Sequence, residues 1–261
     1  PWTIEKKIAN RNGLINSWIL TPIRRAFFRI KLFKNKNDKS ITVVLGVKNR
    51  TGMRVYHSLK SIYNQRYDLD QLHCIVVDYG SDENSSQFTR KITESFGFEY
   101  IYVDNVVKWN RAKALNIGIR KAKSKFILTS DIDIIFSDSY IKESVVALIK
   151  DPFNVVYSYC MDLPEIYNLK LECIYNKNKD VEISSLKKTC SKRWNNSVSY
   201  GINLTYRLYY DYIRGYDEFY SLWGSEDEDL DKRFYLLGLN RKIMTSSESV
   251  YFHIWHPKHE G

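Results

Sequence analysis

Apolar runs and helical patterns alternate along the middle of the chain. The expected strands are residues 41–47, 72–78, 100–103 and 125–130, and the expected helices between them are 51–64, 85–96 and 111–122. Strands that are apolar at nearly every position are buried on both faces, which is typical of a parallel sheet with helices on either side. The pattern therefore predicts an α/β fold with a mostly parallel sheet flanked by helices.

In an open sheet of this kind, ligands bind at the carboxyl ends of the strands. This rule directs attention to residues 48–50, to Asp78 and to residues 131–133, each of which follows an expected strand. Residues 151–200 are polar and show no clear period, so we expect an irregular excursion that is either mobile or faces the acceptor. No motif identifies a role for residues 165–199.

Residues 1–39 differ from the rest in charge. They hold ten of the 40 basic residues and two of the 30 acidic ones, whereas the net charge of the whole chain is +10. Apolar residues recur there at helical spacing, among them Ile19, Ile23, Phe27 and Ile30. Two interpretations stay open: a helix attracted to an anionic membrane surface, or a helix packed on its own domain.

The rest of the composition excludes several classes. A hydrophobic fraction of 44% can fill a core, so the chain is not disordered. The body beyond residue 39 is nearly neutral, which argues against a nucleic-acid partner. The sequence contains no run of about 18 apolar residues, so no membrane-spanning helix is expected. The four cysteines are far apart, which favours reduced thiols and a cytoplasmic setting over a zinc ribbon.

A pair of carboxylates follows the strand at 125–130. Asp131 and Asp133 would point to the same side if the chain stayed extended. Two acids side by side are unfavourable unless a cation or a donor group lies beside them, and carboxylate oxygens suit Mg²⁺ or Mn²⁺. The same spacing is also common on solvated loops.

Four consecutive acids occupy positions 226–229. They could be the first turn of a helix, where negative charge is favoured by the helix dipole. One of them could also act as a general base, and both interpretations can hold together, with Glu228 or Asp229 serving the helix and Asp227 the chemistry.

Three of the five histidines lie near the end of the chain, at His253, His256 and His259. They are either a polar tail or the source of an imidazole that completes a metal site with Asp133.

Taken in order, these motifs resemble a known family. The set is N-R at 49–50, V-D-x-G-S at 77–81, N-R-A-x-x-x-N-x-G at 110–118, D-x-D at 131–133, W-G-x-E-D at 223–227 and a final His. Residues 40–257 resemble GT-A fold glycosyltransferases of family 2. The most similar branch has a C-terminal module like that of the beta-1,4-galactosyltransferases and bacterial chondroitin-type polymerases.

The resemblance implies roles for individual residues. The donor nucleotide would contact Val47, Asn49, Arg50, Asp78, Arg111, Asp131 and Ile132. Asp78 would accept the N3–H of uracil, and Asp133 would bind the metal with His253, or as second choice with His256. Asp227, paired with Glu226, would be the base for the acceptor hydroxyl, and Trp223 would stack on the acceptor sugar.

The implied activity is a metal-dependent, inverting transfer from a UDP-sugar to a glycan or lipid-linked acceptor, in bacterial surface polysaccharide synthesis. Two domains would be expected: the arm at 1–39, and a catalytic domain at 40–261 with its nucleotide-binding half at about 40–135. A retaining transferase of the same fold and a non-catalytic glycan-binding subunit are the alternatives. The arm would place the enzyme at the inner face of the plasma membrane.

Overall fold

The structure is a computed structural model that describes residues 21–32, 37–104, 106, 108–193, 198–221, 224–246 and 248–257. Its strands are β1 (Ile41–Val47), β2 (Leu72–Asp78), β3 (Glu99–Tyr102), β4 (Phe126–Asp131), β5 (Ile134–Phe136), β6 (Asn154–Asp162), β7 (Ser191–Lys192), β8 (Val198–Tyr206), β9 (Asn240–Met244) and β10 (Tyr251–His253). Its labelled helices are α2 (Met53–Tyr63), α3 (Glu83–Ser95), α4 (Arg111–Lys121), α5 (Tyr140–Lys150), α6 (Tyr167–Asn176), α7 (Ile183–Thr189), α8 (Arg207–Ile213) and α9 (Glu226–Leu237).

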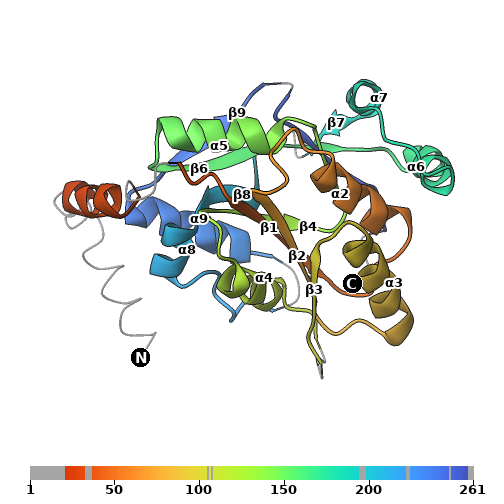
Figure 1. The fold of residues 1–261 in the computed structure, drawn as a ribbon, viewed down its shortest axis with the longest axis horizontal. Helices are drawn as coiled ribbons and strands as arrows, with labels where there is room; N and C mark the ends of the chain where they lie inside the picture. Colours follow the sequence, from red (N-terminus) through yellow and green to blue (C-terminus); the bar gives the residue numbers. More distant parts are fainter. Residues whose placement is uncertain are drawn as a thin grey trace.

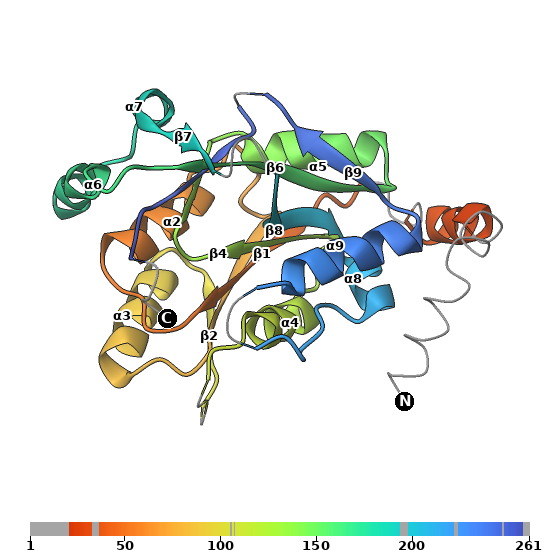
Figure 2. The ribbon, with the colours of Figure 1, turned by 180° about the vertical axis from the view of Figure 1, so that it is seen from behind.

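The strands form one sheet in the order β3-β2-β1-β4-β8-β6-β10-β5, and β7 and β9 also pair with β6. Its first four strands are parallel, as expected, whereas β8 runs antiparallel to both β4 and β6. In both views of the ribbon, α3 and α4 lie on opposite sides of β2 (Figures 1 and 2). The predicted α/β architecture with helices on both faces is confirmed.

The expectation of an irregular segment at residues 151–200 was wrong. This segment contains β6, α6, α7, β7 and the first residues of β8. The helices α6 and α7 project at one end of the molecule (Figure 1). They enclose a second, smaller hydrophobic core that includes Leu171, Leu186, Phe252 and Ile254. Non-local pairing and packing create these elements, so a local reading of a polar segment did not detect them.

Residues 21–32 of the basic arm form a helix that packs on the domain. Phe28 is buried and lies edge-on to Tyr209 and Tyr212 of α8. The Arg25 guanidinium donates to the carbonyl of Gly238, where α9 ends, at 2.8 Å. Ile23, Phe27 and Ile30 are exposed on this helix. Among the described residues, no helix is both long and apolar enough to cross a bilayer.

Gly118 lets α4 approach the sheet closely. A Cβ at this position would lie 2.3 Å from Cγ1 of Val44 on β1. Because packed side chains cannot yield that much space without shifting, the motif N-R-A-x-x-x-N-x-G ends in glycine for a steric reason.

We expect Gly118→Ala to lower the free energy of unfolding by about 1–3 kcal/mol, the usual effect of overpacking. This loss should exceed the gain in helix propensity, which is about 1 kcal/mol. Urea unfolding measures the change, with Lys113→Ala at an exposed position of α4 as the control. Removing the obstacle with Val44→Ala in the same chain should reduce the additional cost of Gly118→Ala; an equal cost in both backgrounds would contradict the steric explanation.

Candidate active site

Strand register brings the expected site residues to one edge of the sheet. Val47 pairs with Asp78 across β1 and β2, and Gly46 pairs with Asp131 across β1 and β4. The three strands therefore end side by side, with a carboxylate on either flank of β1. This alignment follows from the parallel pairing predicted by the apolar runs.

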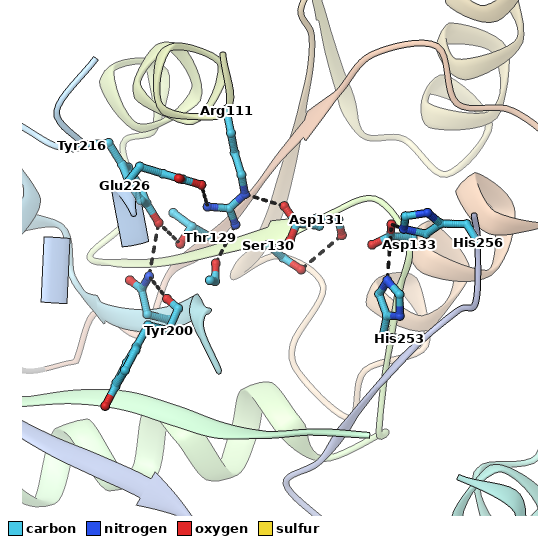
Figure 3. A network of polar contacts seen from close by, with 12 residues as sticks. Arg111, Thr129, Ser130, Asp131, Asp133, Tyr200, Tyr216, Glu226, His253 and His256 are labelled. Atoms are coloured by element: carbon cyan, nitrogen blue, oxygen red, sulfur yellow. Dashed lines mark hydrogen bonds and ion pairs between the residues drawn. The ribbon is translucent and has the colours of Figure 1, made fainter. Parts of the chain in front are cut away.

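Arg111 is the centre of a largely buried ion network (Figure 3). Its Nε donates to Asp131 Oδ1 at 2.6 Å, and one terminal nitrogen donates to the Gly201 carbonyl at 2.6 Å. Its other terminal nitrogen lies 3.5 Å from Glu226 Oε1. Arg111 thus joins α4, β4, β8 and α9. It was expected at the nucleotide, but here its guanidinium is engaged by protein groups.

The start of α4 is fixed by the residues around Arg111. The Asn110 side chain caps the helix by accepting from the Lys113 amide, which leaves Arg111 as the first helical residue. One turn further on, the Asn116 side chain both donates to and accepts from the backbone of Tyr216. The Tyr216 ring lies below the Arg111 guanidinium, 6.0 Å from its centre. These contacts hold the segment before α9 against α4.

Asp131 and Asp133 do not share a ligand position as the extended-chain argument predicted. The strand β4 ends at Asp131, and the chain then turns. Asp131 faces Arg111, whereas Asp133 is buried and faces His253 and His256 on the other side (Figure 3). The reason is that the turn breaks the two-residue alternation on which the argument relied.

Asp133, His253 and His256 form a candidate metal centre. Their ligand atoms all lie within 4.8 Å of one another. Asp133 Oδ2 lies 3.1 Å from Nε2 of His256 and 3.8 Å from Nε2 of His253. The Nδ1 of His256 contacts the Pro257 carbonyl at 2.9 Å, which leaves Nε2 directed at Asp133. One carboxylate and two imidazoles suit a divalent transition metal. The structure therefore places both histidines at Asp133, whereas the resemblance implied His253, with His256 as an alternative.

The charges in this centre perturb the pKa values of its members. Burial favours the neutral form of Asp133, but the hydrogen bond from His256 and the nearby cationic groups hold the pKa of Asp133 below its usual value. The same hydrogen bond raises the pKa of His256, although partial burial opposes the change. Without a cation, the site therefore favours a protonated His256 beside an ionised Asp133.

The acids at the start of α9 have different surroundings. Burial raises the pKa of Glu226, although Arg111 opposes the change. Asp227 is partly exposed, and its Oδ2 lies close to Gly201. Asp229 forms an ion pair with Arg233 at 2.7 Å, one turn along the helix. Of the four, Glu226 and Asp227 face the Arg111 network.

The carboxylate expected to read the nucleotide base is fully enclosed. Asp78 is 0% exposed, and its two oxygens accept from the Ser81 amide and the Tyr100 hydroxyl, at 2.9 and 2.6 Å. A base could reach this carboxylate only if neighbouring side chains moved. Asn49, at φ 51°, accepts from the Asp82 amide and so ties the ends of β1 and β2 together.

The remaining predicted residues fall into two groups. Val47 and Ile132 are buried in the core, and Arg50 acts electrostatically on the candidate metal centre, where its charge lowers the pKa of Asp133. Trp223, the predicted acceptor platform, lies outside the described residues, so its role stays a prediction. Sequence reasoning missed Asp162 and Arg193 beside His253 and the carbonyl of Gly201, because no local motif marks them.

The pair of His256 and Asp133 predicts a pH dependence of stability in the metal-free protein. Because folding raises the pKa of His256, the contribution of the pair is present below the unfolded pKa of about 6.5 and is lost as the pH rises through the folded value. We expect His256→Gln to lower the free energy of unfolding more at pH 5.5 than at pH 9, as measured by urea denaturation with chelator. The exposed His73→Gln is the control. Equal losses at both pH values would rule out this assignment.

Comparison with known proteins agrees with this geometry. The sequence pattern of glycosyl transferase family 2 matches residues 42–200, and a pattern described as the N-terminal domain of galactosyltransferase matches residues 180–257. The human chondroitin sulfate N-acetylgalactosaminyltransferase 2 is 27% identical over 197 residues, which cover 72% of this chain and 34% of that protein. The chain thus spans about a third of the length of this relative. With a match over more than half its length, the chain belongs to glycosyl transferase family 2 and is a glycosyltransferase of GT-A fold.

Proposed function

We propose that the enzyme transfers a sugar from a UDP-sugar to a hydroxyl of a glycan or lipid-linked acceptor, with inversion and with a divalent cation. One observation carries this proposal: the cluster of Asp133, His253 and His256 lies beside the Arg111 network at one edge of the sheet. A cation site next to a set of carboxylates is what transfer from a nucleotide diphosphate needs.

A bound cation would supply Lewis-acid stabilisation of the departing diphosphate. The protein groups have separate tasks around it. Asp227 takes the proton of the acceptor hydroxyl, from a position next to Gly201. Arg111 holds Asp131 and Glu226 in place and offsets their negative charge. The acceptor oxygen attacks the anomeric carbon on the face opposite the diphosphate, the bond to the diphosphate breaks, and UDP leaves. The configuration of the sugar is therefore inverted.

The printed name of the human relative suggests the donor to test first. That protein is an N-acetylgalactosaminyltransferase, so UDP-N-acetylgalactosamine is the first candidate, followed by other UDP-hexoses and UDP-N-acetylhexosamines.

We further propose a role in bacterial surface polysaccharide synthesis, which rests on the resemblance of the motifs to those of bacterial chondroitin-type polymerases. The cation would be Mn²⁺ before Mg²⁺, because two imidazole ligands favour a transition metal over a cation that prefers oxygen.

A donor screen tests this function. Hydrolysis and transfer are measured for UDP-glucose, UDP-galactose, UDP-N-acetylglucosamine, UDP-N-acetylgalactosamine and GDP-mannose, with Mn²⁺, with Mg²⁺ and with chelator. We expect turnover of a UDP-sugar that needs a cation and is greatest with Mn²⁺. Asp133→Asn should lose metal-dependent turnover. Full activity in excess chelator, or a preference for GDP-mannose, would reject the proposal.

Substitutions among the four acids at residues 226–229 test which of them is the general base. Positioned proton abstraction contributes about 10²–10⁴-fold in rate, so Asp227→Asn should lose at least about 100-fold in kcat while UDP binding changes little. Glu228→Gln, at an exposed position of the same helix turn, is the matched control. NMR of the product should show inverted configuration. Retained configuration would favour the alternative mechanism, and an active Asp227→Asn with an inactive Glu226→Gln would move the base to Glu226.

We also propose that the arm at residues 1–39 binds an anionic membrane surface. Helix 21–32 supports this, because it exposes Ile23, Phe27 and Ile30 beside basic residues while Phe28 anchors it to the domain. Replacing the three exposed residues with Ser should weaken flotation with anionic vesicles, and added salt should weaken it in the parent protein. Val146→Ser with Ile149→Ser, exposed on α5, is the control pair. Equal flotation of both variants would refute the proposal.

A further inference from the structure

Behind His253, on the side away from Asp133, two further side chains complete a polar row. Nδ1 of His253 lies 3.1 Å from Asp162 Oδ1. Nε of Arg193 donates to the same carboxylate at 3.1 Å, and a terminal nitrogen of Arg193 lies 3.3 Å from Nδ1 of His253. None of the motifs noted in the sequence includes Asp162 or Arg193.

Metal binding at Nε2 would require one tautomer of His253, and the polar row contains the acceptor that this tautomer needs. A neutral imidazole carries its proton on one nitrogen only, and the other nitrogen is then free to bind a metal. Without a cation, Nδ1 can accept from the Arg193 guanidinium at 3.3 Å. If Nε2 bound a cation beside Asp133, the proton of a neutral His253 would have to lie on Nδ1. Asp162 Oδ1, 3.1 Å away, is the acceptor for it, because Arg193 offers donors only.

Backbone register brings the three residues together. His253 pairs with Asp162 in the parallel ladder of β10 and β6. Asp162 pairs with Ser191 in the antiparallel ladder of β6 and β7, and Arg193 directly follows β7. The excursion formed by residues 163–190 thus leaves the sheet at Asp162 and returns beside it. The strand β7, by which the chain returns, places Arg193 next to the carboxylate of Asp162.

The excursion also fixes the backbone on both sides of His253. Phe252 and Ile254 are buried in the second core together with Tyr167, Leu171 and Leu186 of the excursion. The amide of Leu163 donates to the carbonyl of His253 at 3.0 Å. The imidazole is therefore held through its neighbours, through its carbonyl and through Nδ1, and all three supports involve the excursion or the residue from which it departs.

From this arrangement we infer that the excursion belongs to the metal centre, and that Asp162 and Arg193 are positioning residues that orient His253 as a metal ligand. The inference rests on the proposed cation site at Asp133. Partners that orient a ligating histidine typically change metal affinity by about 10–100-fold when they are removed. Arg193 acts one step further away, by holding the carboxylate of Asp162.

Mn²⁺ affinity is the direct test, measured by calorimetry and by the electron paramagnetic resonance signal of free Mn²⁺, without any substrate. We expect Asp162→Ala to weaken Mn²⁺ binding by about 10–100-fold, and Asp162→Asn by less, because an amide oxygen still accepts from Nδ1. Arg193→Gln should weaken it by a smaller factor, which Arg193→Lys partly restores. Lys188→Gln, an exposed basic residue of the same excursion, is the matched control.

The outcomes separate this inference from the proposed function. If the parent protein binds Mn²⁺, Asp133→Ala abolishes binding, and the Asp162 and Arg193 variants keep affinity within a factor of two, then the positioning roles are wrong and the metal site stands. If the parent protein does not bind Mn²⁺, the metal site itself is wrong. Thermal unfolding with chelator identifies a variant that has merely lost stability, and Arg193→Gln, at a partly exposed surface position, then decides the question.

Discussion

Arg111 carries a positive charge into the interior, and the elements around it are arranged to compensate that charge. A buried guanidinium is strongly unfavourable unless several acceptors surround it. Here they come from three separate elements: Asp131 at the end of β4, Gly201 within β8 and Glu226 at the start of α9. Because the acceptors are far apart in the sequence, the ion network forms only when the two halves of the domain meet. It therefore links folding of the domain to assembly of the site.

The first half of the fold could be predicted from the sequence, because its strands carry a local signal. β1, β2 and β4 are buried at nearly every position and read as largely apolar runs, and parallel pairing then brings Asp78 and Asp131 to the same edge of the sheet. The second half carries no such signal. β8 mixes polar and apolar residues, since its position is set by pairing with β4 on one side and β6 on the other.

The candidate site shows the same division between local and non-local information. Residue type and order pointed to Asp133, His253 and His256, and the structure brings these three together. The resemblance assigned different roles to Asp131 and Asp133, but the extended-strand pattern did not predict their separate environments, because a turn after β4 cancels the alternation of an extended chain. Asp162 and Arg193 were missed because only strand register, which no short motif encodes, places them beside His253.

The excursion between β6 and β7 has one more consequence, for how such a fold can vary. Its two ends are adjacent residues of a ladder, so the distance that any intervening chain must close is the same whatever its length. Closing a loop twice as long costs only about 0.6 kcal/mol more in chain entropy. Insertions and deletions between these ends should therefore be tolerated by the sheet, provided that the returning strand still offers a guanidinium to Asp162 and that the segment still covers Phe252 and Ile254. The segment is thus a place where related chains can diverge in length and surface without rebuilding the edge of the sheet that carries the candidate site.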